Sequence, residues 1–127
     1  MPQRFEVVDH RLRPARQLIS PNHSRRPDAS EVSLLVIHNI SLPPGQFGGR
    51  FIDDLFLNCL DCTVHPFFAE IADLKVSAHL MIDRSGAVTP YVPFDKKAWH
   101  DGHSCFQGSE QCNEFSIGIE LEGTDEL

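Results

Sequence analysis

The sequence predicts an α+β fold, with a β-sheet and a short helix. The sheet is indicated by a β-branched apolar run at residues 33–39, a hairpin pattern over residues 77–93 and an alternating run at residues 115–122. The length of 127 residues and the 41% apolar composition suit one compact core. We therefore expect a single domain over residues 1–127.

The N-terminal segment, residues 1–31, differs in composition from the rest of the chain. Pro14, Pro21 and Pro27 stand among arginine, serine and asparagine residues. Proline fixes φ and removes a backbone donor, which disfavours a helix interior or a central strand. We expect residues 1–31 to form an extended arm laid over the surface of the domain.

Residues 33–39, Ser-Leu-Leu-Val-Ile-His-Asn, form the clearest strand pattern, and Pro43-Pro44-Gly45 follows soon after them. A continuous apolar run of this length predicts a strand buried on both faces. The run ends in His38 and Asn39, and strand ends of this kind commonly open into a site.

Residues 77–83 and 87–93 flank a turn that contains Gly86. Because glycine permits a positive φ in such a turn, the two runs are expected to pair as a β-hairpin. Pro90 limits the second strand of this hairpin to an edge position or a bulge.

Residues 115–122 alternate with a period of two, which predicts a final strand. Its apolar residues, Ile117, Ile119 and Leu121, share one side. The opposite side carries Ser116, Gly118, Glu120 and Glu122.

Helical cover for this sheet is scarce. Apolar residues recur at helical spacing from Phe51 towards Cys59, which predicts one short helix. One short helix is too little to cover both faces of a sheet. We therefore expect that a C-terminal element is missing from the chain, which stops at Leu127 just after the last strand.

Bulk composition excludes several partners. The net charge of -7 argues against nucleic acid or an anionic membrane surface, because both require a basic face. We find no apolar run of signal-peptide length and none near the roughly 18 residues of a membrane span. We expect a cytoplasmic protein that keeps its four cysteines as free thiols. An anionic small molecule stays open as a partner, and the oligomeric state is not predicted.

Histidines at strand ends are candidate reactive groups, and four of the seven lie there or in loops: His38, His79, His100 and His103. His38 closes an apolar strand, where a rigid backbone suits a zinc ligand. The alternative for His38 is a hydrogen-bonded structural histidine.

Glu120 stands on the polar side of its strand beside Gly118, whose missing side chain would let a substrate approach. A carboxylate there can act as a general base, and the alternative is a solvated glutamate on an exposed sheet face. Trp99 with His100 suits an aromatic wall for a sugar or peptide, against the alternative of an ordinary partly buried tryptophan.

Cys59-Leu60-Asp61-Cys62 has the spacing of a zinc knuckle or a redox pair. The other two cysteines, Cys105 and Cys112, are seven residues apart, and only His100 and His103 lie near them in the sequence. A structural zinc site built on the cysteines stays open as the weaker alternative.

Four motifs together resemble the AmpD-type anhydro-N-acetylmuramyl-L-alanine amidases, in order over roughly residues 10–127. The resemblance implies a mixed sheet shared with a phage lysozyme and with peptidoglycan recognition proteins, and one catalytic zinc ion. The four motifs are Leu-Val-Ile-His-Asn-Ile-Ser-Leu-Pro-Pro-Gly at 35–45, Val-Ser-Ala-His at 76–79, Tyr-Val-Pro-Phe-Asp-Lys-Lys-Ala-Trp-His at 91–100 and Cys-Asn-Glu-Phe-Ser-Ile-Gly-Ile-Glu-Leu-Glu-Gly-Thr-Asp at 112–125.

The resemblance also implies roles for single residues. His38 matches the first zinc ligand of the family and Glu120 its catalytic acid/base. Asn39, Trp99 and His100 match positions near the substrate cleft. The family's other two zinc ligands and its oxyanion-binding lysine follow a C-terminal helix, and no residue of this chain matches them.

Two positions near the acidic groups of a muropeptide depart from the arginine expected in close relatives. Lys75 keeps the positive charge without the guanidinium fork, and Gln111 keeps neither. The activity implied is zinc-dependent hydrolysis of the amide between the lactyl group of anhydro-N-acetylmuramic acid and L-alanine, in cell-wall recycling. The alternative is a muropeptide-binding module of the same fold without catalysis, and oligomerisation stays open.

Overall fold

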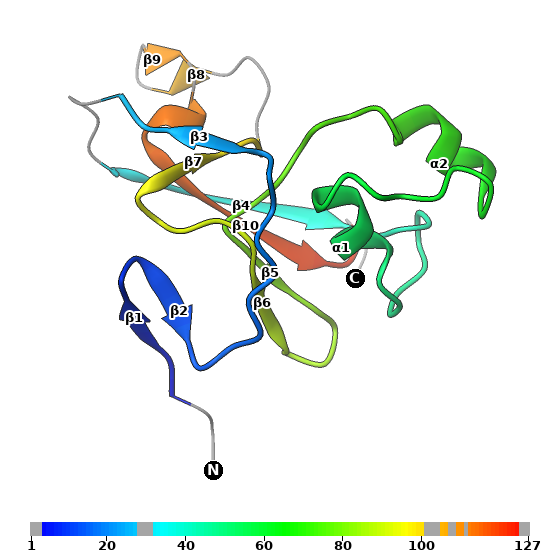
Figure 1. Ribbon diagram of the computed structural model, residues 1–127, viewed down its shortest axis with the longest axis horizontal. Helices are drawn as coiled ribbons and strands as arrows, with labels where there is room; N and C mark the ends of the chain where they lie inside the picture. Colours follow the sequence, from blue (N-terminus) through cyan, green and yellow to red (C-terminus); the bar gives the residue numbers. More distant parts are fainter. Residues whose placement is uncertain (1–3, 28–31, 101–104, 107–108, 111, 125–127) are drawn as a thin grey trace.

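The computed structural model describes residues 4–27, 32–100, 105–106, 109–110 and 112–124. A four-stranded sheet forms its centre, and the two helices lie together beside that sheet (Figure 1). The sheet contains parallel and antiparallel pairs and is therefore mixed. Together with the two helices, it confirms the α+β class. The elements in chain order are β1 (Glu6–Val8), β2 (Arg11–Arg13), β3 (His23–Arg25), β4 (Leu34–Ile40), α1 (Phe51–Phe56), α2 (Pro66–Ile71), β5 (Leu80–Ile82), β6 (Val88–Pro90), β7 (Lys96–Ala98), β8 (Cys105–Phe106), β9 (Ser109–Glu110), a 3₁₀ turn η1 (Cys112–Glu114) and β10 (Ser116–Glu122).

The central sheet has the strand order β4-β10-β5-β6. β10 runs parallel to both β4 and β5, while β5 and β6 are antiparallel. The strands expected at 33–39 and 115–122 are confirmed as β4 and β10. The hairpin is confirmed as well, since Gly86 has φ +90 in its turn and Pro90 ends the edge strand β6.

Residues 4–27 contain a hairpin, β1–β2, and the strand β3, which pairs with β7. Between them, the N–H groups of Leu18 and Ser20 donate to the carbonyls of Pro90 and Tyr91. The remainder of the predicted arm, residues 1–3 and 28–31, lies outside the described residues.

The hydrophobic core lies between the sheet and the helices. α1 contributes Ile52, Leu55 and Phe56, and α2 contributes Phe68. The predicted helix begins at Phe51 as expected and ends at Phe56. α2 was not predicted; Pro66 occupies its first turn, and the His65 side chain caps it by accepting from Phe67 N–H.

The two faces of β4 and β10 are buried unequally. The expectation that β4 is buried on both faces is wrong, because Leu35 is 59% and Ile37 51% exposed. In the ladder these residues align with Ile117 and Ile119 of β10. These four side chains form an apolar face that the described residues cover only in part.

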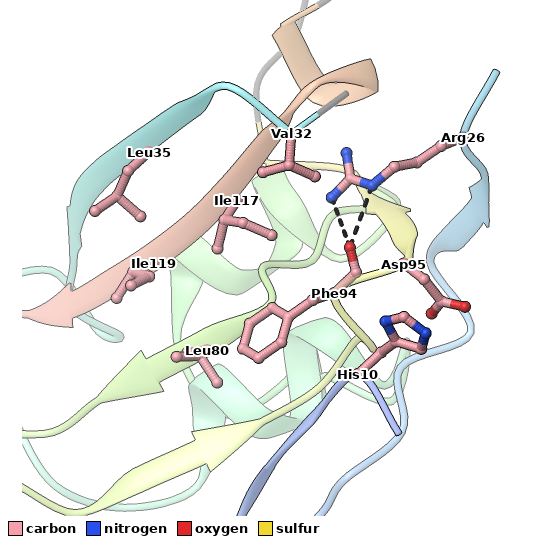
Figure 2. A pocket seen from close by; sticks show the side chains of 9 residues that line it. All are labelled: His10, Arg26, Val32, Leu35, Leu80, Phe94, Asp95, Ile117 and Ile119. Atoms are coloured by element: carbon pink, nitrogen blue, oxygen red, sulfur yellow. Dashed lines mark hydrogen bonds between the residues drawn. The ribbon is translucent and has the colours of Figure 1, made fainter. Parts of the chain in front are cut away.

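Part of this apolar face borders a pocket of about 650 Å³, lined by Leu80, Phe94 and the β4 and β10 side chains (Figure 2). Arg26 reaches its rim, and the guanidinium donates to the carbonyls of Phe94, Asn113, Glu114 and Ser116. Burial lowers the pKa of Arg26, with Asp95 opposing that shift. Arg26 therefore ties β3 to the start of β10.

Candidate functional site

His38 and Glu120 occupy paired positions on neighbouring strands. The Cα atom of Glu120 pairs with that of His38 in the parallel ladder, so both side chains stand on the same face of the sheet. His38 is half-buried and Glu120 is 8% exposed. A solvated glutamate on an exposed face is therefore the wrong description of Glu120. A buried carboxylate beside an imidazole is suited to moving the proton of a water molecule.

His100 lies on the same face and contacts His38 directly. Its Nδ1 is 3.0 Å from His38 Nε2, and the two ring centroids are 5.2 Å apart. The other nitrogen, Nε2, is 2.8 Å from the hydroxyl of Ser116, which is fully buried. The structure thus brings together two of the residues singled out in the sequence and adds Ser116.

The sequence suggested that Gly118 leaves room for a substrate. The structure contradicts this, because the His100 ring occupies that space. A Cβ on Gly118 would lie 2.4 Å from His100 Cγ, far inside van der Waals contact. The glycine is needed for the close approach of a ring 18 positions earlier in the chain, and only the folded structure reveals that proximity.

Trp99 is half-buried, at the end of the β7 segment. Its indole N–H donates to Ser24 Oγ at 3.1 Å, and its backbone N–H donates to Ser77 Oγ. These bonds fix the backbone immediately before His100.

His79, another of the four candidate histidines, is fully buried. Gly118 N–H donates to its Nδ1 at 3.1 Å, so the proton is on Nε2, which donates to Lys96 O at 2.8 Å. Burial lowers the pKa of His79 to about 4, and the nearby Arg26 acts in the same direction. His79 is a neutral structural residue that links β10 to β7.

Asn39 and Lys75 are both exposed. Asn39 pairs with Leu121 and points to the face opposite His38, although both line a pocket of about 360 Å³ at the carboxyl ends of β4 and β10. Lys75 lies between α2 and β5 and is not among the residues that line this pocket.

Glu122 is a buried carboxylate to which we assigned no role from the sequence. One oxygen accepts from Gly48 N–H at 2.9 Å and the other from Arg84 N–H at 3.1 Å. The Arg84 guanidinium also lies 4.5 Å above the Phe47 ring. Glu122 therefore joins the loop after β4 to the turn of the β5–β6 hairpin. Strand alternation had indicated its face but not these partners.

Metal-binding groups are incomplete in the part of the chain that the structure describes. Within that part, no three His, Cys, Asp or Glu side chains are grouped closely enough to hold a metal ion. Cys59 and Cys62 are exposed thiols with no disulfide. His103 and Gln111 lie outside the described residues. His38 supplies the nitrogen donor that zinc prefers, but a catalytic zinc requires about three protein ligands.

Residues 28–126 match the protein-family model described as N-acetylmuramoyl-L-alanine amidase, Amidase_2. The chain belongs to this family. Proteins named 1,6-anhydro-N-acetylmuramyl-L-alanine amidase AmpD are similar to most of the chain. The protein from Salmonella typhimurium is 63% identical over 113 residues, covering 89% of this chain and 60% of its own length. The Escherichia coli protein is 62% identical over 113 residues, covering 89% of this chain and 62% of its own.

Solved amidase structures agree with the fold. A crystal structure of a selenomethionine derivative of AmpD has a TM-score of 0.93 at 57% identity, covering 96% of this chain and 68% of that one. The solution structure of Citrobacter freundii AmpD has a TM-score of 0.56 at 61% identity, covering 89% and 60%. The chain thus spans about 60% of the length of the curated amidases it matches.

In the described residues, no helix combines the length and apolar character that crossing a bilayer requires.

Proposed function

We propose that this chain carries the reactive pair of a zinc-dependent N-acetylmuramoyl-L-alanine amidase. The substrate would be a peptidoglycan fragment, cleaved at the amide between the lactyl group of anhydro-N-acetylmuramic acid and L-alanine. The main support is the pairing of His38 with buried Glu120 on adjacent parallel strands. The names of the similar amidases supply the substrate class.

Zinc is the proposed cofactor, with His38 as one of its ligands. The donor fits, because neutral imidazole is a common zinc ligand and His38 lies on a rigid strand at the sheet end. The described residues supply only part of the set. We therefore expect the remaining zinc ligands to lie outside the described residues. A bound zinc ion would supply a Lewis acid for the amide carbonyl and would acidify the attacking water.

Glu120 is the proposed acid and base of the reaction. Its carboxylate takes a proton from the attacking water as the new C–O bond forms, and it returns that proton to the amide nitrogen as the C–N bond breaks. The products are a free lactyl carboxylate and the amine of L-alanine. Burial of Glu120 keeps bulk water from exchanging the proton during this transfer.

Three residues are proposed to orient the substrate: Asn39 at the pocket shared with His38, Trp99 beside His100, and Lys75 towards an acidic group of the peptide. His100, the fourth substrate contact expected from the sequence, already has side-chain partners at both ring nitrogens. We assign it no direct substrate contact. The proposed place of action is the cytoplasm, in cell-wall recycling, and the exposed thiols of Cys59 and Cys62 suit a reducing compartment.

Turnover of an anhydro-muropeptide, followed as release of the stem peptide, tests this function. The protein is the full-length product of the gene that encodes this chain. Glu120→Gln should lower kcat by about 10²–10⁴-fold while zinc content and Tm stay unchanged. Glu70→Gln, an exposed glutamate of α2, is the matched control and should keep wild-type turnover. Wild-type kcat in Glu120→Gln with zinc bound would refute the proposal, and binding of the muropeptide without zinc or cleavage would favour a binding module.

A further inference from the structure

The His100 ring is located by three separate contacts. Its Nε2 is 2.8 Å from Ser116 Oγ, and its Nδ1 is 3.0 Å from His38 Nε2. Its carbon atoms lie against the backbone of Gly118, in the space that a Cβ would need. The ring therefore connects the strand that carries Glu120 to the imidazole of His38.

The backbone beneath the ring is itself held in place. Gly118 N–H donates to His79 Nδ1 at 3.1 Å, and His79 N–H donates to Gly118 O at 2.9 Å. His79 is fully buried, and its ring stacks 5.9 Å from that of Phe94. Because β10 is anchored there, the height of His100 above the sheet is set by the fold.

The direction of the hydrogen bonds through His100 is limited to two patterns. In a neutral histidine one ring nitrogen donates and the other accepts. In the first pattern His38 Nε2–H donates to His100, whose own Nε2–H donates to Ser116. In the second pattern every bond runs from Ser116 towards His38. The first pattern makes Nδ1 the unprotonated nitrogen of His38, and the second places the proton on Nδ1.

Zinc binding by His38 would favour the first pattern. A ligating imidazole gives one nitrogen to the ion and donates the N–H of the other to a nearby acceptor, which fixes the tautomer and the orientation of the ring. Building on the zinc function proposed above, we propose that His100 is a positioning residue for His38. Supported by Ser116 and Gly118, the His100 ring accepts a hydrogen bond from Nε2–H of His38. This bond makes Nδ1 of His38 the nitrogen that faces the zinc ion.

Imidazole ¹⁵N NMR of the metal-free, full-length product of the gene tests the tautomer without metal or substrate. The spectra are recorded at a pH where the imidazoles are neutral, and we expect His38 to carry its proton on Nε2. His65 is an internal reference, because its Nδ1 accepts from Phe67 N–H and its tautomer does not depend on His100. A proton on His38 Nδ1 overturns the proposal, whether or not the protein hydrolyses muropeptides.

Three variants separate positioning from packing. His100→Ala removes the acceptor, so His38 should populate both tautomers. His100→Asn keeps an acceptor oxygen near the place of Nδ1 and should restore the Nε2–H form. Ser116→Ala leaves the ring over Gly118 and should shift the His38 population in part, which keeps the test valid if His100→Ala fails to fold. A His38 tautomer that changes in none of the folded variants overturns the proposal.

Zinc affinity gives a second measurement, made on the full-length product of the gene by competition with a chelator. His100→Ala should weaken zinc binding by about 10–100-fold, and His100→Asn by less. Equal affinity in wild type and His100→Ala would overturn the positioning role. If wild type binds no zinc, the proposed function fails, and the tautomer of His38 still decides between the two hydrogen-bond patterns.

Discussion

Gly118→Ala would place a methyl group where the His100 ring now lies. A Cβ on Gly118 would be 2.4 Å from His100 Cγ and 2.5 Å from Cδ2, whereas carbon atoms rest at roughly 3.5–4.0 Å. The strand cannot retreat, because both backbone groups of Gly118 bond to His79. The His100 ring must therefore move away from the sheet.

The magnitude follows from what the ring loses. Displacement breaks the contacts of His100 with Ser116 and His38, each worth about 0.5–1.5 kcal/mol net. Overpacking adds about 1–3 kcal/mol. We expect the free energy of unfolding to fall by about 2–6 kcal/mol in Gly118→Ala, measured by urea unfolding.

A double-mutant cycle isolates the clash. In a His100→Ala background the ring is absent, so Gly118→Ala should cost less than about 0.5 kcal/mol there. Equal losses of unfolding free energy in the two backgrounds would refute the placement of His100 over Gly118. The same conclusion would follow if Gly118→Ala were as stable as wild type.

Three further predictions concern buried polar groups. Arg26→Lys should lower the free energy of unfolding by about 1–3 kcal/mol, because an ammonium cannot reach all four carbonyls to which the guanidinium donates. The control is Arg13→Lys at an exposed position. A loss in Arg26→Lys no larger than in this control would contradict the prediction. Glu122→Gln should cost about 1–2 kcal/mol and speed hydrogen exchange at the Gly48 and Arg84 amides, since one amide oxygen replaces two acceptors; unchanged exchange at both amides would count against it. His79 has a folded pKa of about 4 against an ordinary 6.5. Its contribution to the free energy of unfolding is therefore complete above pH 6.5 and is lost as the pH falls towards 4. The total loss is about 3 kcal/mol. Urea unfolding across this range should show a slope that His79→Gln flattens, and a flat wild-type profile would contradict the assignment.

The elements with local signals could be predicted from the sequence. β4 has a β-branched run, the β5–β6 hairpin has Gly86 in its turn, and β10 has strict alternation. α2 was missed although it has six residues, the same length as α1. Its Pro66 at the first turn was the available signal.

The burial of the two sheet faces could not be predicted in the same way. Alternation separates the sides of a strand, but it does not say which side meets the core. On β10 the polar side is buried, because Glu120, Ser116 and Glu122 find partners or neighbours there, while Leu121 is 41% exposed. Hydrophobicity alone suggests the reverse assignment.

The sequence singled out His38, Glu120 and His100 as candidates, but it did not predict which of them lie close together. His38 and Glu120 lie 82 positions apart, and only the parallel register aligns them. The contact of His100 with Gly118 likewise depends on β7 and β10 meeting in the folded chain. These relations are tertiary, so neither spacing nor propensity reports them.

The central claim is that His38 belongs to a zinc site beside Glu120. Elemental analysis of the full-length product of the gene, beside the 127-residue chain and with His38→Ala in each, tests it most directly. We expect one zinc per chain in the full-length wild type and loss of that zinc in His38→Ala, with Cys59→Ala retaining it. Zinc that survives His38→Ala and is lost in Cys59→Ala would contradict the account, and a full-length protein without zinc would indicate a muropeptide-binding module instead.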